Sequence, residues 1–84
     1  MKYPLFSRIV LATDIPAENL RRGDLATVVE HYETPGVEPG YEIEVFNAVG
    51  DTVAVVTVSE SQIEAPRSNE RPCVRPETRR ATAE

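Results

Sequence analysis

Residues 41–59, with the sequence YEIEVFNAVGDTVAVVTVS, decide the fold because they contain the two most regular apolar patterns in the chain. Apolar and acidic residues alternate over 41–46, so the apolar side chains share one face of a strand and Glu42 and Glu44 share the other. The β-branched run 52–59 is typical of a strand that is buried on much of both faces. Turn-forming residues 47–51, with a glycine late in the loop, connect these two segments. The pattern predicts a β-hairpin.

Two earlier segments predict strands that pair with this hairpin. Residues 25–32 (LATVVEHY) form a second β-rich run, which begins after the turn pair Gly23-Asp24. Residues 8–12 (RIVLA) predict a short first strand. The intervening loop contains residues that oppose a long regular element, and we expect at most one helical turn there, over 17–22.

The remaining connections predict a sheet that closes around a small core. Two prolines and two glycines in residues 33–40 predict a surface loop. Residues 61–63 predict a 3₁₀ turn that places Ile63 in the core, followed by a short last strand. Aromatic residues make up only 6% of the chain, so the core is small. The alternation on each strand assigns nine residues to this core: Ile9, Leu11, Val28, Tyr41, Ile43, Val45, Val53, Val55 and Ile63.

The apolar pattern stops after Ala65, and this divides the chain into two parts. Residues 66–84 contain three prolines and five arginines but no periodic apolar residues. Such a segment cannot bury enough surface to offset its ordering entropy, so we expect a flexible Arg/Pro-rich tail. Residues 1–65 form the folded domain, and the chain is too short for a second one.

Short strands, a long irregular first loop, a tight central hairpin and a closing 3₁₀ turn predict an all-β fold, a small five-stranded SH3-like barrel. Five short runs carry a resemblance: Ile15-Pro16, LRRGD at 20–24, TVVE at 27–30, YEIEVF at 41–46 and VVTV at 55–58. In these runs the chain resembles a family of small bacterial proteins, common in cyanobacteria and classed as a domain of unknown function. The resemblance spans roughly residues 5–65. It implies an SH3-like barrel without known catalysis, in genes often found beside a second small gene, as in toxin–antitoxin or immunity cassettes.

The charge balance and the single cysteine exclude several classes of protein. Fourteen acidic against nine basic residues give a net charge of −5, the wrong sign for passive attraction to nucleic acid. The apolar stretch near the start is broken by Ser7 and Arg8, which leaves neither a signal-peptide core nor a membrane span. Cys73 cannot form an internal disulfide, and this favours a reducing cytoplasm.

No set of residues carries a catalytic or metal-binding signature. His31 is the only histidine, and a general base needs a partner within hydrogen-bond reach. We interpret it as an outward-facing strand residue near Glu30 and Glu33. One histidine and one distant cysteine do not supply the ligands of a metal site. Gly23-Asp24 lacks the lysine of a phosphate-binding loop and is a turn. We therefore expect no enzyme, no cofactor and no small-molecule ligand.

Acidic residues predict a recognition surface instead. Five glutamates from neighbouring segments can form one patch: Glu30, Glu33, Glu38, Glu42 and Glu44. Such charges usually solvate a face and discourage edge pairing. The alternative is a surface complementary to a basic partner protein. The tail adds Arg71 and Arg75, each of which precedes a proline.

The leading hypothesis is a non-catalytic protein-binding module, specifically an antitoxin or immunity-like inhibitor of a toxin encoded by a neighbouring gene. Residues 1–65 carry a net charge of −7, and the tail carries +2 and can wrap a partner. The residues that we expect to bind the partner are Glu30, Glu42, Glu44, Arg71 and Arg75. Two alternatives stay open: a nucleic-acid-associated or ribosome-associated SH3-like module that uses the arginines, and an accessory subunit of a larger complex.

Overall fold

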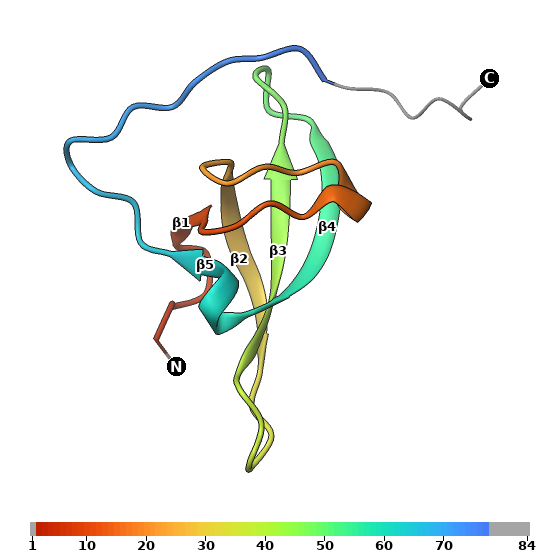
Figure 1. Cartoon of the computed structure of the whole chain (residues 1–84), viewed down its shortest axis with the longest axis vertical. Helices are drawn as coiled ribbons and strands as arrows, with labels where there is room; N and C mark the ends of the chain where they lie inside the picture. The colour runs from red at the N-terminus through yellow and green to blue at the C-terminus, as the bar shows by residue number, and fades with distance from the viewer. Residues whose placement is uncertain (1, 78–84) are drawn as a thin grey trace.

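The computed structural model describes residues 2–77, which form a single antiparallel sheet (Figure 1). In the order β4-β3-β2-β1-β5, its strands are β1 (Arg8–Leu11), β2 (Leu25–Tyr32), β3 (Gly40–Phe46), β4 (Thr52–Ser59) and β5 (Ile63–Glu64). The 3₁₀ turns η1 (Pro16–Glu18) and η2 (Glu60–Gln62) are the only helical segments in this part of the chain. Neither is long and apolar enough to cross a membrane. The sheet curls into a half-barrel, which confirms the predicted all-β class and the five strands.

The turns form where the sequence supplies the required backbone geometry. In the β3–β4 loop, Asn47 Oδ1 accepts hydrogen bonds from the N–H groups of Val49 (3.2 Å) and Asp51 (2.8 Å). Gly50 then adopts a φ of 94°, which glycine reaches without steric strain. The side chain thus imitates a backbone turn and directs the chain into β4. The predicted hairpin is confirmed.

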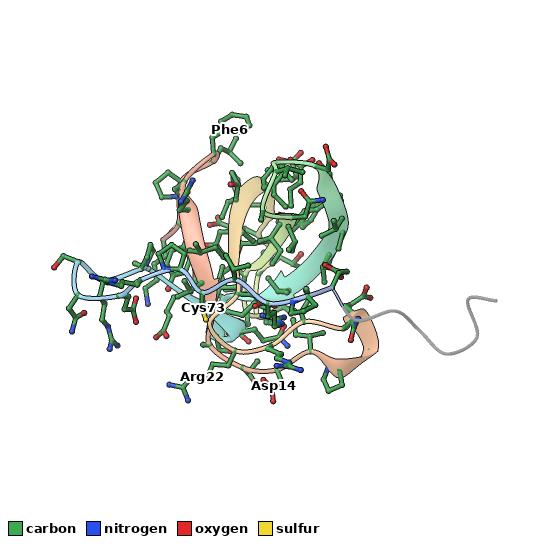
Figure 2. The ribbon with its side chains drawn as sticks, turned by 90° about the horizontal axis from the view of Figure 1, so that it is seen from above. Phe6, Asp14, Arg22 and Cys73 are labelled. Atoms are coloured by element: carbon green, nitrogen blue, oxygen red, sulfur yellow. The ribbon has the colours of Figure 1, made fainter. Side chains whose placement is uncertain are left out.

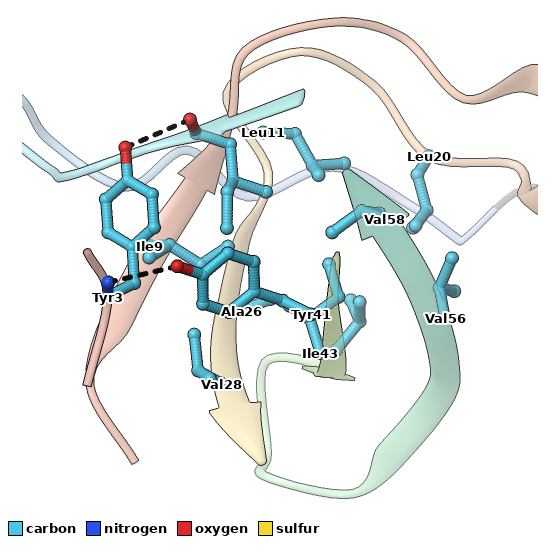
Figure 3. Packing of buried hydrophobic residues seen from close by; sticks show 12 residues of the cluster. Tyr3, Ile9, Leu11, Leu20, Ala26, Val28, Tyr41, Ile43, Val56 and Val58 are labelled. Atoms are coloured by element: carbon cyan, nitrogen blue, oxygen red, sulfur yellow. Dashed lines mark hydrogen bonds between the residues drawn. The ribbon is translucent and has the colours of Figure 1, made fainter. Parts of the chain in front are cut away.

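The concave side of the sheet holds one apolar core (Figure 3). Seven of the nine predicted positions are buried in it: Ile9, Leu11, Val28, Tyr41, Ile43, Val45 and Ile63. The pattern did not assign Tyr3, Leu20, Ala26, Val56 and Val58, which also belong to the core. Leu20 reaches it because Ile15 N–H donates to Leu20 C=O (3.0 Å) and this bridge closes the first loop.

Tyr41 joins three parts of the fold through its hydroxyl group. The hydroxyl donates to the Glu60 carboxylate (2.7 Å) and accepts the N–H groups of Lys2 (3.2 Å) and Tyr3 (3.3 Å). The Tyr3 ring packs edge to face on the Tyr41 ring, and the Tyr3 hydroxyl donates to Ile63 C=O (3.3 Å). Burial, followed by the hydrogen bond to Glu60, raises the pKa of Tyr41, so its hydroxyl remains a donor. These bonds fix the N-terminal segment to β3 and β5.

The predicted core was wrong for β4, where Val53 and Val55 are 41% and 52% exposed. The β3–β4 register shifts at the loop end of the hairpin, which leaves Val53 as an extra residue, a β-bulge. One inserted residue turns every following side chain to the opposite face of the sheet. Val56 and Val58 therefore enter the core in place of Val55.

A second bulge changes the position of His31. The β2–β3 register shifts between Val28 and Glu30, so His31 lies opposite Tyr41 and shares its concave face. The interpretation of His31 as an outward-facing residue is wrong for this reason. Its Nδ1 atom is buried and has no hydrogen-bond partner among the residues that the structure covers.

The tail is described as far as residue 77, and residues 66–77 contain no helix or strand. This segment leaves β5, passes along the outer side of β1 and reaches the turn before β2 (Figures 1 and 2). The rest of the predicted flexible tail, residues 78–84, lies outside the described residues.

Candidate functional site

Three glutamates share the outer face of the sheet. Glu42 and Glu44 alternate with core residues along β3, and Glu30 of β2 lies directly opposite Glu42. On the other side, β4 places Thr57 opposite Glu42 and Val55 opposite Glu44. We call the surface formed by Glu30, Glu42 and Glu44 the acidic face. Because all three residues belong to paired strands, their positions are fixed by the backbone of the sheet.

Hydroxyl groups orient two of these carboxylates. The Tyr32 hydroxyl donates to Glu42 Oε1 (2.9 Å), and the Thr52 hydroxyl donates to Glu44 Oε2 (2.8 Å). The hydrogen bond to Glu42 raises the pKa of Tyr32, and desolvation and the charges of Glu42 and Glu30 raise it further. Tyr32 therefore remains a donor at neutral pH. Each carboxylate keeps further lone pairs with which it can accept bonds from a ligand.

Apolar side chains lie among the carboxylates. Val55 is 52% exposed and Tyr32 is 47% exposed. Phe46, two residues after Glu44 on β3, is 41% exposed. Protein interfaces bury apolar and aromatic side chains at their centre and use charged groups for steering and register. The outer face of β2, β3 and β4 has both components.

The other two predicted acidic residues lie off the strands. Glu33 and Glu38 belong to the β2–β3 connection. Glu38 accepts a hydrogen bond from Ser61 N–H (2.7 Å), so it ties this connection to η2. The structure thus places three of the five predicted glutamates in one face.

Arg75 makes a separate contact with the body of the protein. Both of its Nη atoms donate to the Asp24 carboxylate, with 2.7 Å between Nη2 and Oδ2. Partial burial raises the pKa of Asp24, but the hydrogen bonds from Arg75 and from Arg21 N–H outweigh this effect and lower the pKa overall. The hydrogen bond with Asp24 in turn raises the pKa of Arg75. This bidentate pair fixes the tail to the turn before β2.

Arg71 lines a groove of about 460 Å³ between the tail and the outer side of β1. Four arginines and two glutamates contribute to its walls: Arg8, Arg22, Arg67, Arg71, Glu64 and Glu70. A larger groove of about 690 Å³ lies between the tail, the turn before β2 and the β3–β4 loop. Cys73 of the tail lines this larger groove together with Arg22, which also lines the smaller one (Figure 2). The predicted partner-binding residues are therefore divided between the acidic face and the tail.

Phe6 is a candidate that sequence reasoning missed. It is 75% exposed and has a φ of 67°, although it is not a glycine. Its N–H donates to Val28 C=O (2.6 Å), which holds this conformation at the start of β1. Strained, exposed residues often mark a functional surface. A positive φ leaves no trace in the apolar pattern, so no signal in the sequence could have identified it.

The described residues show no cluster suited to metal binding. Within residues 2–77, no three His, Cys, Asp or Glu side chains lie close enough to hold a metal ion. The His31 Nδ1 atom lies within the sheet without a partner in that range. What the outer face of the sheet does combine is carboxylates with exposed apolar side chains.

Comparisons with known proteins bear on the family of the chain. No curated protein and no solved structure matches it, so the SH3-like type of the barrel and the bacterial origin stay predictions. The predicted resemblance to a family of unknown function is confirmed. A family model described as "Domain of unknown function (DUF4926)" matches residues 5–65, which is more than half of the chain, and the chain therefore belongs to this family.

Proposed function

We propose that the protein is a non-catalytic protein-binding module that recognises a basic partner through the acidic face. The observation that carries this proposal is the register of Glu30 and Glu42, which lie directly opposite each other on adjacent strands. Like charges at this spacing destabilise an isolated sheet. A partner with cations at matching positions would remove this repulsion. The arrangement thus opposes folding and favours binding.

The surroundings of the acidic face support the same function. Residues 1–65 carry a net charge of −7, which steers a basic partner toward the folded body. Val55 and Tyr32 supply exposed apolar area beside the carboxylates. Apolar and aromatic anchors of this kind provide most of the binding energy of an interface, whereas the charges mainly accelerate association.

In its finer form the proposal is a cytoplasmic antitoxin or immunity-like inhibitor of a protein encoded by a neighbouring gene. This form rests on the gene arrangement that the family resemblance implies. A toxin that acts on nucleic acid has a basic active surface, and an acidic inhibitor complements such a surface. An accessory subunit of a larger complex would use the same acidic face and would differ only in its partner.

A second candidate is a nucleic-acid-associated or ribosome-associated module. The groove lined by Arg8, Arg22, Arg67 and Arg71 favours it, because it concentrates positive charge in an acidic chain. Such a groove can contact phosphate groups irrespective of the net charge of the protein. The acidic face takes no part in this function.

The test measures binding of the full chain to the product of the neighbouring gene at low and at physiological salt. Changing Glu42→Lys and Glu44→Lys together is expected to weaken binding at least about tenfold, mainly through slower association, and to reduce its salt dependence. The matched control changes Glu18→Lys and Glu77→Lys, which are exposed and lie outside the acidic face. Both variants alter the net charge equally, and circular dichroism checks that each is folded.

Unchanged affinity in the first variant would contradict the role of the acidic face. RNA binding is measured in parallel. Tight, salt-sensitive binding of RNA by the unmodified chain, lost after Arg8→Glu and Arg22→Glu, would instead support the second candidate.

A further inference from the structure

The two edges of the sheet differ in how they are protected. β5 forms one edge with only two residues, Pro66 follows it closely, and Arg67 pairs with Glu64 at 3.9 Å. Short length, proline and charge all prevent an edge strand from pairing with another chain. β4 forms the other edge with eight residues, TVAVVTVS, which include neither a charge nor a proline. In Figure 1, β4 is the last strand on its side of the sheet, with the β1–β2 loop crossing in front of it, and no strand of residues 2–77 pairs with its outer edge, which we call the open edge.

Hydrogen bonding along β4 alternates between β3 and this open edge. At the end of the β3–β4 ladder, Glu60 N–H donates to Pro39 C=O (2.9 Å). Hydrogen-bonded pairs recur at every second residue of an antiparallel ladder. The register therefore assigns the N–H and C=O groups of Val56 and Val58 to bonds with β3.

The residues between them face the other way. Val55 and Thr57 direct their N–H and C=O groups toward the open edge. Ser59 follows the same alternation, because its N–H donates to Gln62 Oε1 (2.8 Å) and not to β3. Two consecutive sets of backbone donors and acceptors are thus available for an added strand.

The side chains around the open edge indicate what such a strand would contain. An added strand would lie about 4.8 Å from β4 and about 10 Å from β3. On the outer side, its residues would lie beside Val55 and Thr57, with Glu42 and Glu44 one strand further on. Long cationic side chains can lay their aliphatic stems on Val55 and reach the glutamates. On the concave side, alternate residues would continue the apolar row of Val56 and Val58.

We propose that β4 is the docking edge for an extended segment of the partner in which lysine or arginine alternates with apolar residues. This inference rests on the proposed function and identifies the part of the partner that the acidic face recognises. The segment extends the sheet by one strand, its main chain pairs with Val55 and Thr57, and its cations lie over Glu42 and Glu44.

A second copy of the chain fits this edge less well. Pairing two β4 strands would join two sheets whose outer faces both carry Glu30, Glu42 and Glu44. Each chain has a net charge of −5, so the joined sheet would have an acidic face twice as wide. A basic segment neutralises this charge, whereas a second copy increases it.

The experiment uses the full chain and a synthetic eight-residue peptide in which lysine and valine alternate. Amide hydrogen exchange by NMR reports on each residue of β4. Without peptide, Val56 and Val58 should exchange slowly and Val55 and Thr57 quickly. With peptide, exchange at Val55 and Thr57 should slow at least about tenfold, because their N–H groups become hydrogen-bonded. A peptide with glutamate in place of lysine is the charge control.

Two changes block the backbone pairing without altering charge. Thr57→Pro removes an N–H that points away from β3, so the ladder with β3 is kept. A peptide that is N-methylated at alternate residues removes the matching donors from the ligand and needs no change in the protein. Each change is expected to weaken binding at least about tenfold relative to the unmodified pair.

The outcomes separate this inference from the proposed function. The docking edge is overturned if Val55 and Thr57 still exchange quickly when peptide is bound, or if the N-methylated peptide binds as well as the unmodified one. In that case, loss of binding in the Glu42→Lys and Glu44→Lys variant would still support the acidic face. Equal affinity for the glutamate peptide overturns the proposal that the docked segment carries lysine or arginine. Slow exchange at Val55 and Thr57 without peptide, together with a concentration-dependent mass, assigns the edge to a second copy and overturns the proposal.

Discussion

The sheet and the tail are held in place by different interactions. Ile43 and Tyr41 in the sheet are 0% exposed, whereas every residue from 66 to 77 is exposed and the contact between Arg75 and Asp24 ties this segment to the body. Full burial of an aliphatic side chain contributes about 1.5–3 kcal/mol, and a surface ion pair about 0–1 kcal/mol. The tail can therefore leave the body without unfolding the sheet.

The largest expected effect comes from truncating the core of the sheet. Ile43→Ala should lower the free energy of unfolding by about 2–4 kcal/mol, because it leaves a cavity at a residue that is fully buried. Val55→Ala, on the same pair of strands but on the outer face, should change it by less than about 0.5 kcal/mol. Urea denaturation measures both. Equal losses in the two variants would mean that β4 has no bulge at Val53.

Release of the tail should have a smaller effect on stability and a clear effect on proteolysis. Asp24→Asn removes the charge that binds Arg75 but keeps an oxygen that can accept the Arg21 N–H. We expect unfolding to become easier by less than about 1 kcal/mol and trypsin to cleave severalfold faster after Arg67, the one arginine of residues 66–77 that does not precede a proline. Asp14→Asn is the matched control, because Asp14 binds Arg22 N–H and not the tail. The same cleavage rate in both variants would show that Asp24 does not hold the tail.

The same contact predicts a pH dependence at low pH. The folded protein lowers the pKa of Asp24 below its ordinary value of 3.8. The contribution of the pair is therefore fully present above this value and is lost as the pH falls through the lower pKa of the folded state. An NMR titration of the Arg75 guanidinium should show one transition below pH 3.8, absent in Asp24→Asn. A transition above that value would mean that the carboxylate is not stabilised by Arg75.

The smallest expected effect is on the titration of Tyr32. Glu42→Gln removes the negative charge at the acceptor of its hydroxyl, so the pKa of Tyr32 should fall toward its ordinary value of 10.0. Glu44→Gln should leave this pKa unchanged, because Glu44 binds the Thr52 hydroxyl instead. Ultraviolet absorbance of the tyrosinate measures both variants. A shift of equal size in the control would contradict the orientation of Glu42 by Tyr32.

The sequence predicts those features of the fold that depend on local pattern. Alternation placed the strands and put Glu42 and Glu44 on the face opposite Ile43, because strand periodicity is a local property. The bulge at Val53 inserts a valine into a run of valines, so no change of composition marks it.

Contacts between distant residues could not be predicted. Arg75 and Asp24 are 51 residues apart, and neither has a neighbour that identifies the other. The position of Glu30 opposite Glu42 depends on the register shift after Val28, which the apolar pattern does not mark. The sequence could therefore predict that Glu42 and Glu44 share a face, but not that Glu30 lies directly opposite Glu42.

The pairing of β5 with β1 has a consequence for the order of folding. Leu11 pairs with Ile63, so the last two strand residues of the sheet complete the edge of the first strand. During synthesis, β1 to β4 are finished while this edge of β1 still lacks its partner. Pairing between such distant segments is slow to form, and unpaired edges in the interval promote aggregation. A chain that stops before residue 63 would keep the pairings among β1 to β4 and lose the strand that protects β1.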